Sequence, residues 1–134
     1  MPYATVADLV AEFGEDEIRD LTDRASPPAG EIDAAVAGRA LTRAETTVNG
    51  YLASRYTLPA PAGAVRGYVL DLARSYLYVN TMPETVKNRF DAAMRDLKAI
   101  GQGLMTLPVA TAAEPAPARS SGMAVRTRTR TFGG

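Results

Sequence analysis

The clearest periodicity in the chain lies in residues 84–104, whose sequence is ETVKNRFDAAMRDLKAIGQGL. Apolar side chains recur there alternately four and three positions apart for nearly three heptads, at Val86, Phe90, Ala93, Leu97, Ile100 and Leu104. This spacing predicts a helix with one apolar seam, which begins after Met82-Pro83. Charged residues of both signs lie between the seam positions, as on a solvated face, until Gly101 and Gly103 end the helix.

Two more long helices are predicted upstream of this seam. The first covers residues 31–56 and the second residues 64–80, with a stiff proline-containing connection between them. Their inward-facing positions are expected at Ile32, Val36, Ala40, Ala44, Val48 and Leu52, and at Val65, Val69, Leu72, Tyr76 and Val79. Gly38 and Gly50 each disfavour a helix interior by about 1 kcal/mol relative to alanine, so we expect them to permit a close crossing or a bend. Asn49-Gly50 is also compatible with a turn, but the apolar surface continues beyond it through Tyr51.

The N-terminal region predicts two short helices. Thr5 and Asp8 have the spacing of a capping box, and Gly14 ends the helix that they open. The acidic run Glu15-Asp16-Glu17 favours the positive end of a second helix dipole, and Ser26-Pro27-Pro28-Ala29-Gly30 breaks that helix. Their apolar contacts are expected from Leu9, Val10, Phe13, Ile18 and Leu21.

These patterns predict an all-α protein, a small bundle of about five helices, with an extended C-terminal arm. Residues 1–107 form the helical body in this interpretation. Residues 108–124 are rich in Ala, Pro, Ser and Thr and form a tether that reaches on the order of 55 Å if fully extended. Residues 125–134 form the end of the arm.

The arm ends in a pattern found nowhere else in the chain. The alternating residues are Val125, Arg126, Thr127, Arg128, Thr129, Arg130, Thr131 and Phe132. Strict alternation with β-branched threonines predicts a β-strand, with the three arginines on one face and the threonines on the other. A lone strand has no ladder partner in an otherwise helical chain, so we expect it to pair with another protein. The alternative is a disordered basic tail that happens to alternate.

Composition excludes several kinds of site. The 134 residues include no cysteine and no histidine, which removes disulfides, thiolate or imidazole zinc sites, and Ser-His or Cys-His catalysis. We therefore predict no catalytic residue, no metal and no cofactor. The chain has no apolar run long enough to span a membrane and no signal-like N-terminus, so we expect a soluble protein that is intracellular when made, without a membrane partner.

The zero net charge conceals an asymmetry between the two ends of the chain. Residues 1–24 carry seven acidic residues against two arginines, whereas residues 109–134 carry four arginines against one glutamate. Such runs are compatible with solvated surfaces that keep the chain soluble, and equally with recognition of an acidic surface by the arm.

Arg55 and Tyr56, near the end of the predicted helix 31–56, are candidate subunit-interface residues, because guanidinium and aromatic groups are favoured at interfaces. Packing within the chain is the alternative for both, and the preferred interpretation for Tyr51. Tyr68, Tyr76 and Tyr78 are expected to form a helix-packing cluster rather than a binding site.

The chain resembles the gp36-like head–tail connector family of Mu-like phages and prophages over residues 3–107. The motifs that support this resemblance are Tyr3-Ala4-Thr5 with Asp8-Leu9, Phe13-Gly14-Glu15-Asp16-Glu17-Ile18, Leu21-Thr22-Asp23, Gly50-Tyr51-Leu52 with Arg55-Tyr56 and Leu58-Pro59, and Leu72-Ala73-Arg74-Ser75-Tyr76-Leu77-Tyr78. The resemblance implies a helical adaptor that forms a ring, expected to be twelvefold, beneath the phage portal in the neck of the virion. Its implied partners are the portal protein, a downstream neck or tail-completion protein, and DNA that passes through the channel without sequence-specific binding.

On this interpretation the arm docks on the portal. Residues 125–132 add as a strand to a sheet edge, Arg126, Arg128 and Arg130 pair with carboxylates, and Phe132 fills an apolar pocket. Many weak contacts around one ring become strong through avidity.

The sequence is compatible with two other classes of function. A small nucleic-acid-binding protein would use the Arg-Thr tail as a phosphate clamp, but a neutral chain with an acidic N-terminal region argues against it. An enzyme with Glu15, Asp16 and Glu17 as paired carboxylates would need a pocket that shifts their pKa values, whereas these residues are expected in a short exposed turn.

Overall fold

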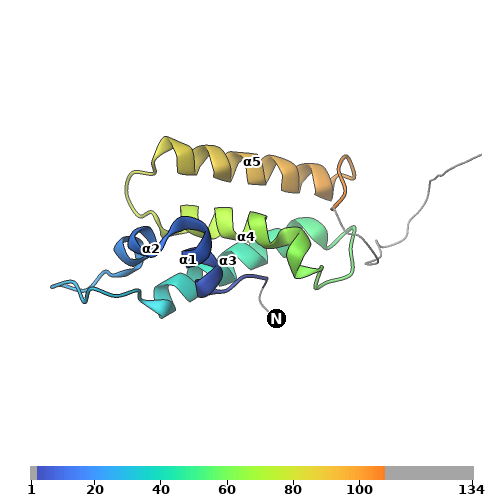
Figure 1. Cartoon of the computed structure of the whole chain (residues 1–134). Helices are drawn as coiled ribbons and strands as arrows, with labels where there is room; N and C mark the ends of the chain where they lie inside the picture. Colours follow the sequence, from blue (N-terminus) through green and yellow to red (C-terminus); the bar gives the residue numbers. More distant parts are fainter. Residues whose placement is uncertain (1–2, 108–134) are drawn as a thin grey trace, which may run out of the picture.

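The structure is a computed structural model that describes residues 3–107. In this part of the chain the only regular elements are five helices, which confirms the predicted all-α body (Figure 1). They are α1 (Val6–Phe13), α2 (Glu15–Thr22), α3 (Ala34–Leu52), α4 (Ala62–Leu77) and α5 (Glu84–Gly101). The predicted strand at residues 125–132 and the tether lie outside the described residues.

The two N-terminal helices form as their sequence predicts. The hydroxyl of Thr5 accepts a hydrogen bond from the Asp8 backbone N–H, and the Asp8 carboxylate accepts one from the Thr5 N–H, which completes the capping box. Gly14 separates α1 from α2 with φ of 97°, a conformation that glycine adopts without strain. Acidic residues occupy the first turn of α2.

Helix α3 is shorter than the predicted helix 31–56. Asp33 caps its start, accepting hydrogen bonds from the backbone N–H groups of Ala35 and Val36, so the helix begins later than expected. It ends at Leu52, and a turn leads to Tyr56. Of the close crossing or bend predicted at Gly38 and Gly50, the close crossing does not occur, because a Cβ added at either position meets nothing within 4 Å.

The last two helices also stop before the predicted apolar pattern does. Helix α4 ends at Leu77, so Val79 is 70% exposed rather than inward-facing. Helix α5 ends at Gly101, and Leu104 is 78% exposed rather than part of the seam. Both errors come from extending a helical period past the residue that ends the helix.

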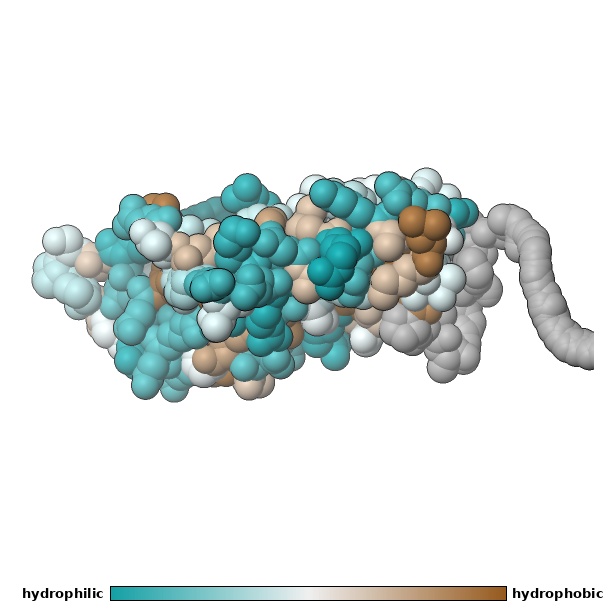
Figure 2. Space-filling view, turned by 90° about the horizontal axis from the view of Figure 1, so that it is seen from above, coloured by the Kyte–Doolittle hydropathy of each residue, from teal (hydrophilic) through white to brown (hydrophobic). Residues whose placement is uncertain are grey.

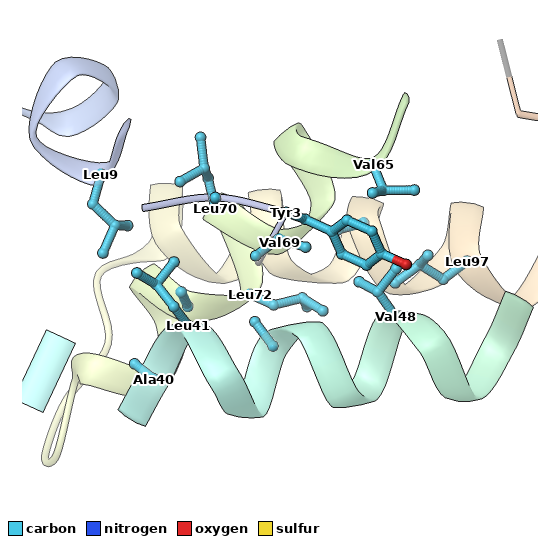
Figure 3. Close-up of a cluster of buried hydrophobic side chains, with 14 of the residues drawn as sticks. Tyr3, Leu9, Ala40, Leu41, Val48, Val65, Val69, Leu70, Leu72 and Leu97 are labelled. Carbon is cyan, nitrogen blue, oxygen red and sulfur yellow. The ribbon is translucent and has the colours of Figure 1, made fainter. Parts of the chain in front are cut away.

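The core lies where α3, α4 and α5 face one another, with α3 and α4 in the most extensive contact. Figure 3 shows Val48 from α3, Leu72 from α4 and Leu97 from α5 in this cluster, together with the ring of Tyr3. Helices α1 and α2 pack beside α3 and α4 through Leu9 and other apolar side chains (Figure 1). The body therefore has two ends, one beside α2 and one where α3 and α5 stop.

Candidate docking end of the helical body

We call the end of the body formed by residues 53–60 and 101–107 the exit end, because the described chain stops there. Tyr56, one of the two predicted interface residues, is buried at this end. Its hydroxyl accepts a hydrogen bond of 3.0 Å from the backbone N–H of Leu107, which is itself buried. Tyr56 thus fixes the last described residue against the end of α3.

Arg55, the second predicted interface residue, is exposed and packs across the turn that follows α5. A Cβ added to Gly103 would overlap the Arg55 guanidinium, and Gly103 has φ of 81°. A Cβ on Gly101 would lie 3.0 Å from the backbone oxygen of Tyr51, so the ends of α3 and α5 approach closely. The structure places Arg55 on the surface and Tyr56 inside, and the interface role of both stays a prediction.

Exposed apolar side chains gather at the exit end. Leu104 is 78% exposed, and Leu58 and Met105 are each 37% exposed. Figure 2 shows hydrophobic surface at the end of the body where α5 stops, beside a largely hydrophilic face. Sequence reasoning missed this surface because it placed Leu104 in the seam, although Gly101 and Gly103 signalled that the helix ends before it.

The other end of the body is held by a charged network. Arg74 of α4 makes two hydrogen bonds to the Glu17 carboxylate of α2, at 2.7 and 3.0 Å, and the Tyr78 hydroxyl donates a third at 3.0 Å. Hydrogen bonding to Arg74 lowers the pKa of Glu17, and the same pair raises the pKa of Arg74. Both side chains are largely shielded from solvent, so this pair attaches α2 to α4 more firmly than a surface ion pair does.

Phe13 of α1 lies between two arginines of this network. The guanidinium carbons of Arg74 and Arg89 lie 4.3 and 5.2 Å from the centre of its ring. Arg89 of α5 also lies 2.9 Å from a carboxylate oxygen of Asp71, although that buried oxygen accepts no well-formed hydrogen bond. Burial raises the pKa of Asp71, and the nearby Arg89 only partly offsets the shift. Helices α1, α2, α4 and α5 meet at this cluster.

Tyr3 connects the N-terminal segment to the middle of the body. Its buried hydroxyl donates to Asn49 at 2.6 Å and accepts from the Ala60 backbone N–H at 3.0 Å. Its backbone N–H donates to Glu45, and its carbonyl accepts from Arg66. The residue therefore joins α3, α4 and the loop between them.

The three tyrosines of α4 and its C-terminal cap contact different elements rather than forming one cluster. Tyr68 donates to Asp96 of α5, Tyr76 packs edge-to-face on Phe90 of α5, and Tyr78 donates to Glu17 of α2. Each has a role in helix packing, as expected, but the cluster itself is not formed.

The acidic residues at the start of α2 are not gathered into one site. Glu15, Asp16 and Glu17 do not share a pocket, since Glu17 is engaged by Arg74 and the other two are exposed. Across residues 3–107 no group of three acidic side chains is placed to hold a metal ion. No helix of this part is long and apolar enough to cross a membrane.

Comparison with known proteins identifies the family. The model of the family described as "Bacteriophage Mu, Gp36" matches residues 3–126. The chain belongs to the phage Mu Gp36 family. Gene product J of Escherichia phage Mu is 42% identical over 59 residues, a match that covers 44% of this chain and 41% of that protein. The matched region thus spans less than half of that relative.

The phage Mu Gp36 family match extends the resemblance expected from the sequence motifs. Those motifs covered residues 3–107, whereas the family match continues to residue 126. Several motif residues now have structural roles: Tyr3 joins three elements, Phe13, Glu17 and Arg74 form the charged cluster, and Tyr56 fixes the exit end. The protein is therefore a phage protein with an all-α body whose motif residues hold that body together.

Proposed function

We propose that this protein is a structural head–tail connector that forms a twelvefold ring beneath the phage portal, in the neck of the virion. On the tail side the ring meets a downstream neck or tail-completion protein, and DNA passes through its channel without sequence-specific binding. Membership of the phage Mu Gp36 family over residues 3–126 supports this role. The sequence motifs that resemble the gp36-like head–tail connectors lie within the matched region.

The exposed apolar surface at the exit end is the main observation that supports docking of a partner protein there. Leu104 and Met105 expose apolar surface immediately before the chain continues beyond Leu107, and Leu107 is fixed by Tyr56. Exposed apolar side chains beside a fixed point of departure favour a protein partner at this end. Arg55 lies on the same surface and supplies a guanidinium for that contact.

The arm completes the proposed attachment. Residues 125–132 add as a strand to a sheet edge of the portal, with Arg126, Arg128 and Arg130 pairing with carboxylates and Phe132 in an apolar pocket. This part of the proposal rests on the sequence pattern alone, since these residues lie outside the described structure.

Binding to isolated portal complexes tests the proposal. The full chain is mixed with portal rings, and bound copies are counted by electron microscopy and by mass, for the wild type and for a chain ending at Pro108. We expect the truncated chain to lose most of its binding, and Leu104→Ser/Met105→Ser to weaken it. Lys98→Ser, an exposed change on α5, is the control and keeps full binding.

The possible outcomes separate the parts of the proposal. Absence of wild-type protein from portal rings and from the neck of intact particles overturns the connector role. Unchanged binding of the truncated chain overturns the arm, and the connector role then stands on the exit end alone. Strong, salt-dependent binding of free duplex DNA that requires the arm favours a phosphate clamp instead.

A further inference from the structure

A hollow lined by arginines lies between α3 and the C-terminal end of α4. Its volume is about 160 Å³, and its polar lining comes from Arg24, Arg39, Arg43 and Tyr76. We call these four residues the arginine hollow. It belongs neither to the exit end nor to the charged cluster around Phe13.

Two of the three guanidinium groups are held in place. The Arg43 guanidinium lies 4.1 Å from the centre of the Tyr76 ring, and that ring is fixed by Phe90 and by a 3.2 Å hydrogen bond to Thr47. Arg24 donates to the backbone oxygens of Leu77 and Leu21, at the ends of α4 and α2. Arginines positioned in this way lose little side-chain freedom when they bind an anion.

The hollow lacks a counter-charge among the described residues. Within residues 3–107 none of its three arginines makes an ion pair with a carboxylate, and the one acidic residue of α3, Glu45, accepts from the N–H of Tyr3. Arg39 and Arg43 lie one helical turn apart, where like charges repel. An anion that enters the hollow relieves this repulsion.

We propose that the hollow binds the carboxylates of Asp16 and Asp20 on α2 of a second copy of the chain. These side chains are 88% and 77% exposed, and within the described residues each is paired only with Arg19, whose side chain is 32% exposed. They lie one helical turn apart, about 6 Å along the axis, and so do Arg39 and Arg43. Two aspartates on one helix therefore face two arginines on another at the same spacing.

The arginine hollow and the Asp16 and Asp20 side chains are placed so that the same contact can repeat from one copy to the next. The hollow adjoins the end of α2 through Arg24, which donates to the Leu21 oxygen, whereas Asp16 and Asp20 of α2 are exposed to solvent. One copy therefore presents both the hollow and the two carboxylates to neighbouring copies. A contact between unlike surfaces closes into a ring when the rotation permits. This inference rests on the proposed ring and names its lateral contact.

A protein carboxylate fits this hollow better than a DNA phosphate does. Residues 3–107 contain more acidic than basic residues, which disfavours the approach of duplex DNA. The hollow is also a small concavity, the size of a side chain, and arginine and tyrosine are the residues that carry binding energy at protein interfaces.

Disulfide trapping tests the contact directly, since the wild-type chain contains no cysteine. The full chain carrying Arg39→Cys and Asp20→Cys is oxidised at high concentration, and linked copies are resolved by denaturing electrophoresis. We expect a ladder of dimers, trimers and larger species. A chain with Asp20→Cys and Lys98→Cys, whose second cysteine lies on the exposed face of α5, is the control and gives no ladder.

Charge reversal in the same cysteine background sharpens the test. Arg43→Asp alone, or Asp16→Arg alone, is expected to lower the ladder yield roughly tenfold, because like charges then face each other across the contact. Both changes in one chain restore the attraction and the ladder. Arg95→Asp, on the exposed face of α5, leaves the yield unchanged.

The outcomes distinguish this contact from the connector role. A ladder no stronger than the control, or one unaffected by Arg43→Asp, overturns the inference even if the wild type binds portal rings. A charge-dependent ladder without portal binding retains the contact and overturns the connector role. Loss of duplex DNA binding in Arg43→Asp with an unchanged ladder identifies the hollow as a phosphate site and also overturns the inference.

Discussion

The two ends of the body are held by different kinds of interaction. At the α2 end, Glu17, Arg74 and Tyr78 join helices through hydrogen bonds to charged groups, with Phe13 between two arginines. At the exit end, α3 and α5 are joined by apolar contact around Ile100, and the segments that follow them are joined by the hydrogen bond from Leu107 to Tyr56. The α2 end is therefore sensitive to pH and to charge, whereas the exit end is sensitive to the shape of its side chains.

The largest expected effect comes from the apolar exit end. Ile100→Ala removes a fully buried side chain of α5 and leaves a cavity, so we expect a loss of about 3 kcal/mol in the free energy of unfolding. Urea denaturation at low and high salt measures it, and the loss is expected to be the same in both. Lys98→Ala, an exposed neighbour, changes stability little. A strong salt dependence contradicts the apolar account of this end.

A smaller loss is expected from the charged end. Arg74→Met keeps much of the side-chain volume but leaves the Glu17 carboxylate without its main donor, which we expect to cost about 2 kcal/mol. A double-mutant cycle with Glu17→Gln measures the part that belongs to the pair. If the two losses simply add, the pair contributes nothing and the contrast between the ends is wrong.

Gly103→Ala tests the close packing at the turn after α5. Its positive φ disfavours alanine, and the added methyl group displaces Arg55, so we expect a loss of about 1 kcal/mol in the free energy of unfolding. Gly38→Ala is the matched control, because this helical position has room for a Cβ, and we expect a gain of up to about 1 kcal/mol. Thermal unfolding compares the two, and a stabilising Gly103→Ala contradicts the packing of Arg55.

The smallest effects are the opposite pH dependences of two carboxyls in the charged cluster around Phe13, those of Glu17 and Asp71. The pKa of Glu17 is lowered in the folded state, so its contribution to stability is present above the ordinary value of 4.5 and is lost as the pH falls through the folded pKa. The pKa of Asp71 is raised, so its ionisation opposes folding as the pH rises above the ordinary value of 3.8.

Paired variants measure these contributions by urea denaturation across acidic pH. Glu17→Gln is expected to lose stability at neutral pH and to flatten the acid side of the profile. Asp71→Asn is expected to gain stability at neutral pH, because it removes a negative charge whose burial opposes folding. Parallel changes in the two profiles contradict the assigned causes of the pKa shifts.

The sequence was sufficient for the all-α body because its signals are local. The Thr5–Asp8 capping box, the Gly14 break and the apolar seam of α5 each depend on residues within a few turns of one another, and each is confirmed. The predictions for Val79 and Leu104 were wrong because periodicity does not indicate where a helix ends.

The polar contacts of the candidate sites could not be predicted, because they join residues that are far apart in the sequence. Glu17 and Arg74 are 57 positions apart, and the arginine hollow brings together Arg24 from the loop after α2, Arg39 from α3 and Tyr76 from α4. No spacing rule encodes such pairs, since the tertiary fold alone decides which helix faces meet. Arg55 and Tyr56 are adjacent and were both predicted as interface residues, yet Arg55 lies on the surface and Tyr56 is buried. The sequence alone does not distinguish these two positions.

The hydrogen bond from Leu107 to Tyr56 determines how the body bears mechanical load. A pull on the chain beyond residue 107 acts first on this bond and on the buried Leu107 side chain, both anchored beside α3. The force then acts on contacts with both α3 and α5, so we do not expect α5 to unfold from its C-terminal end one turn at a time. We therefore expect the helical body to keep its shape when the chain beyond residue 107 is pulled.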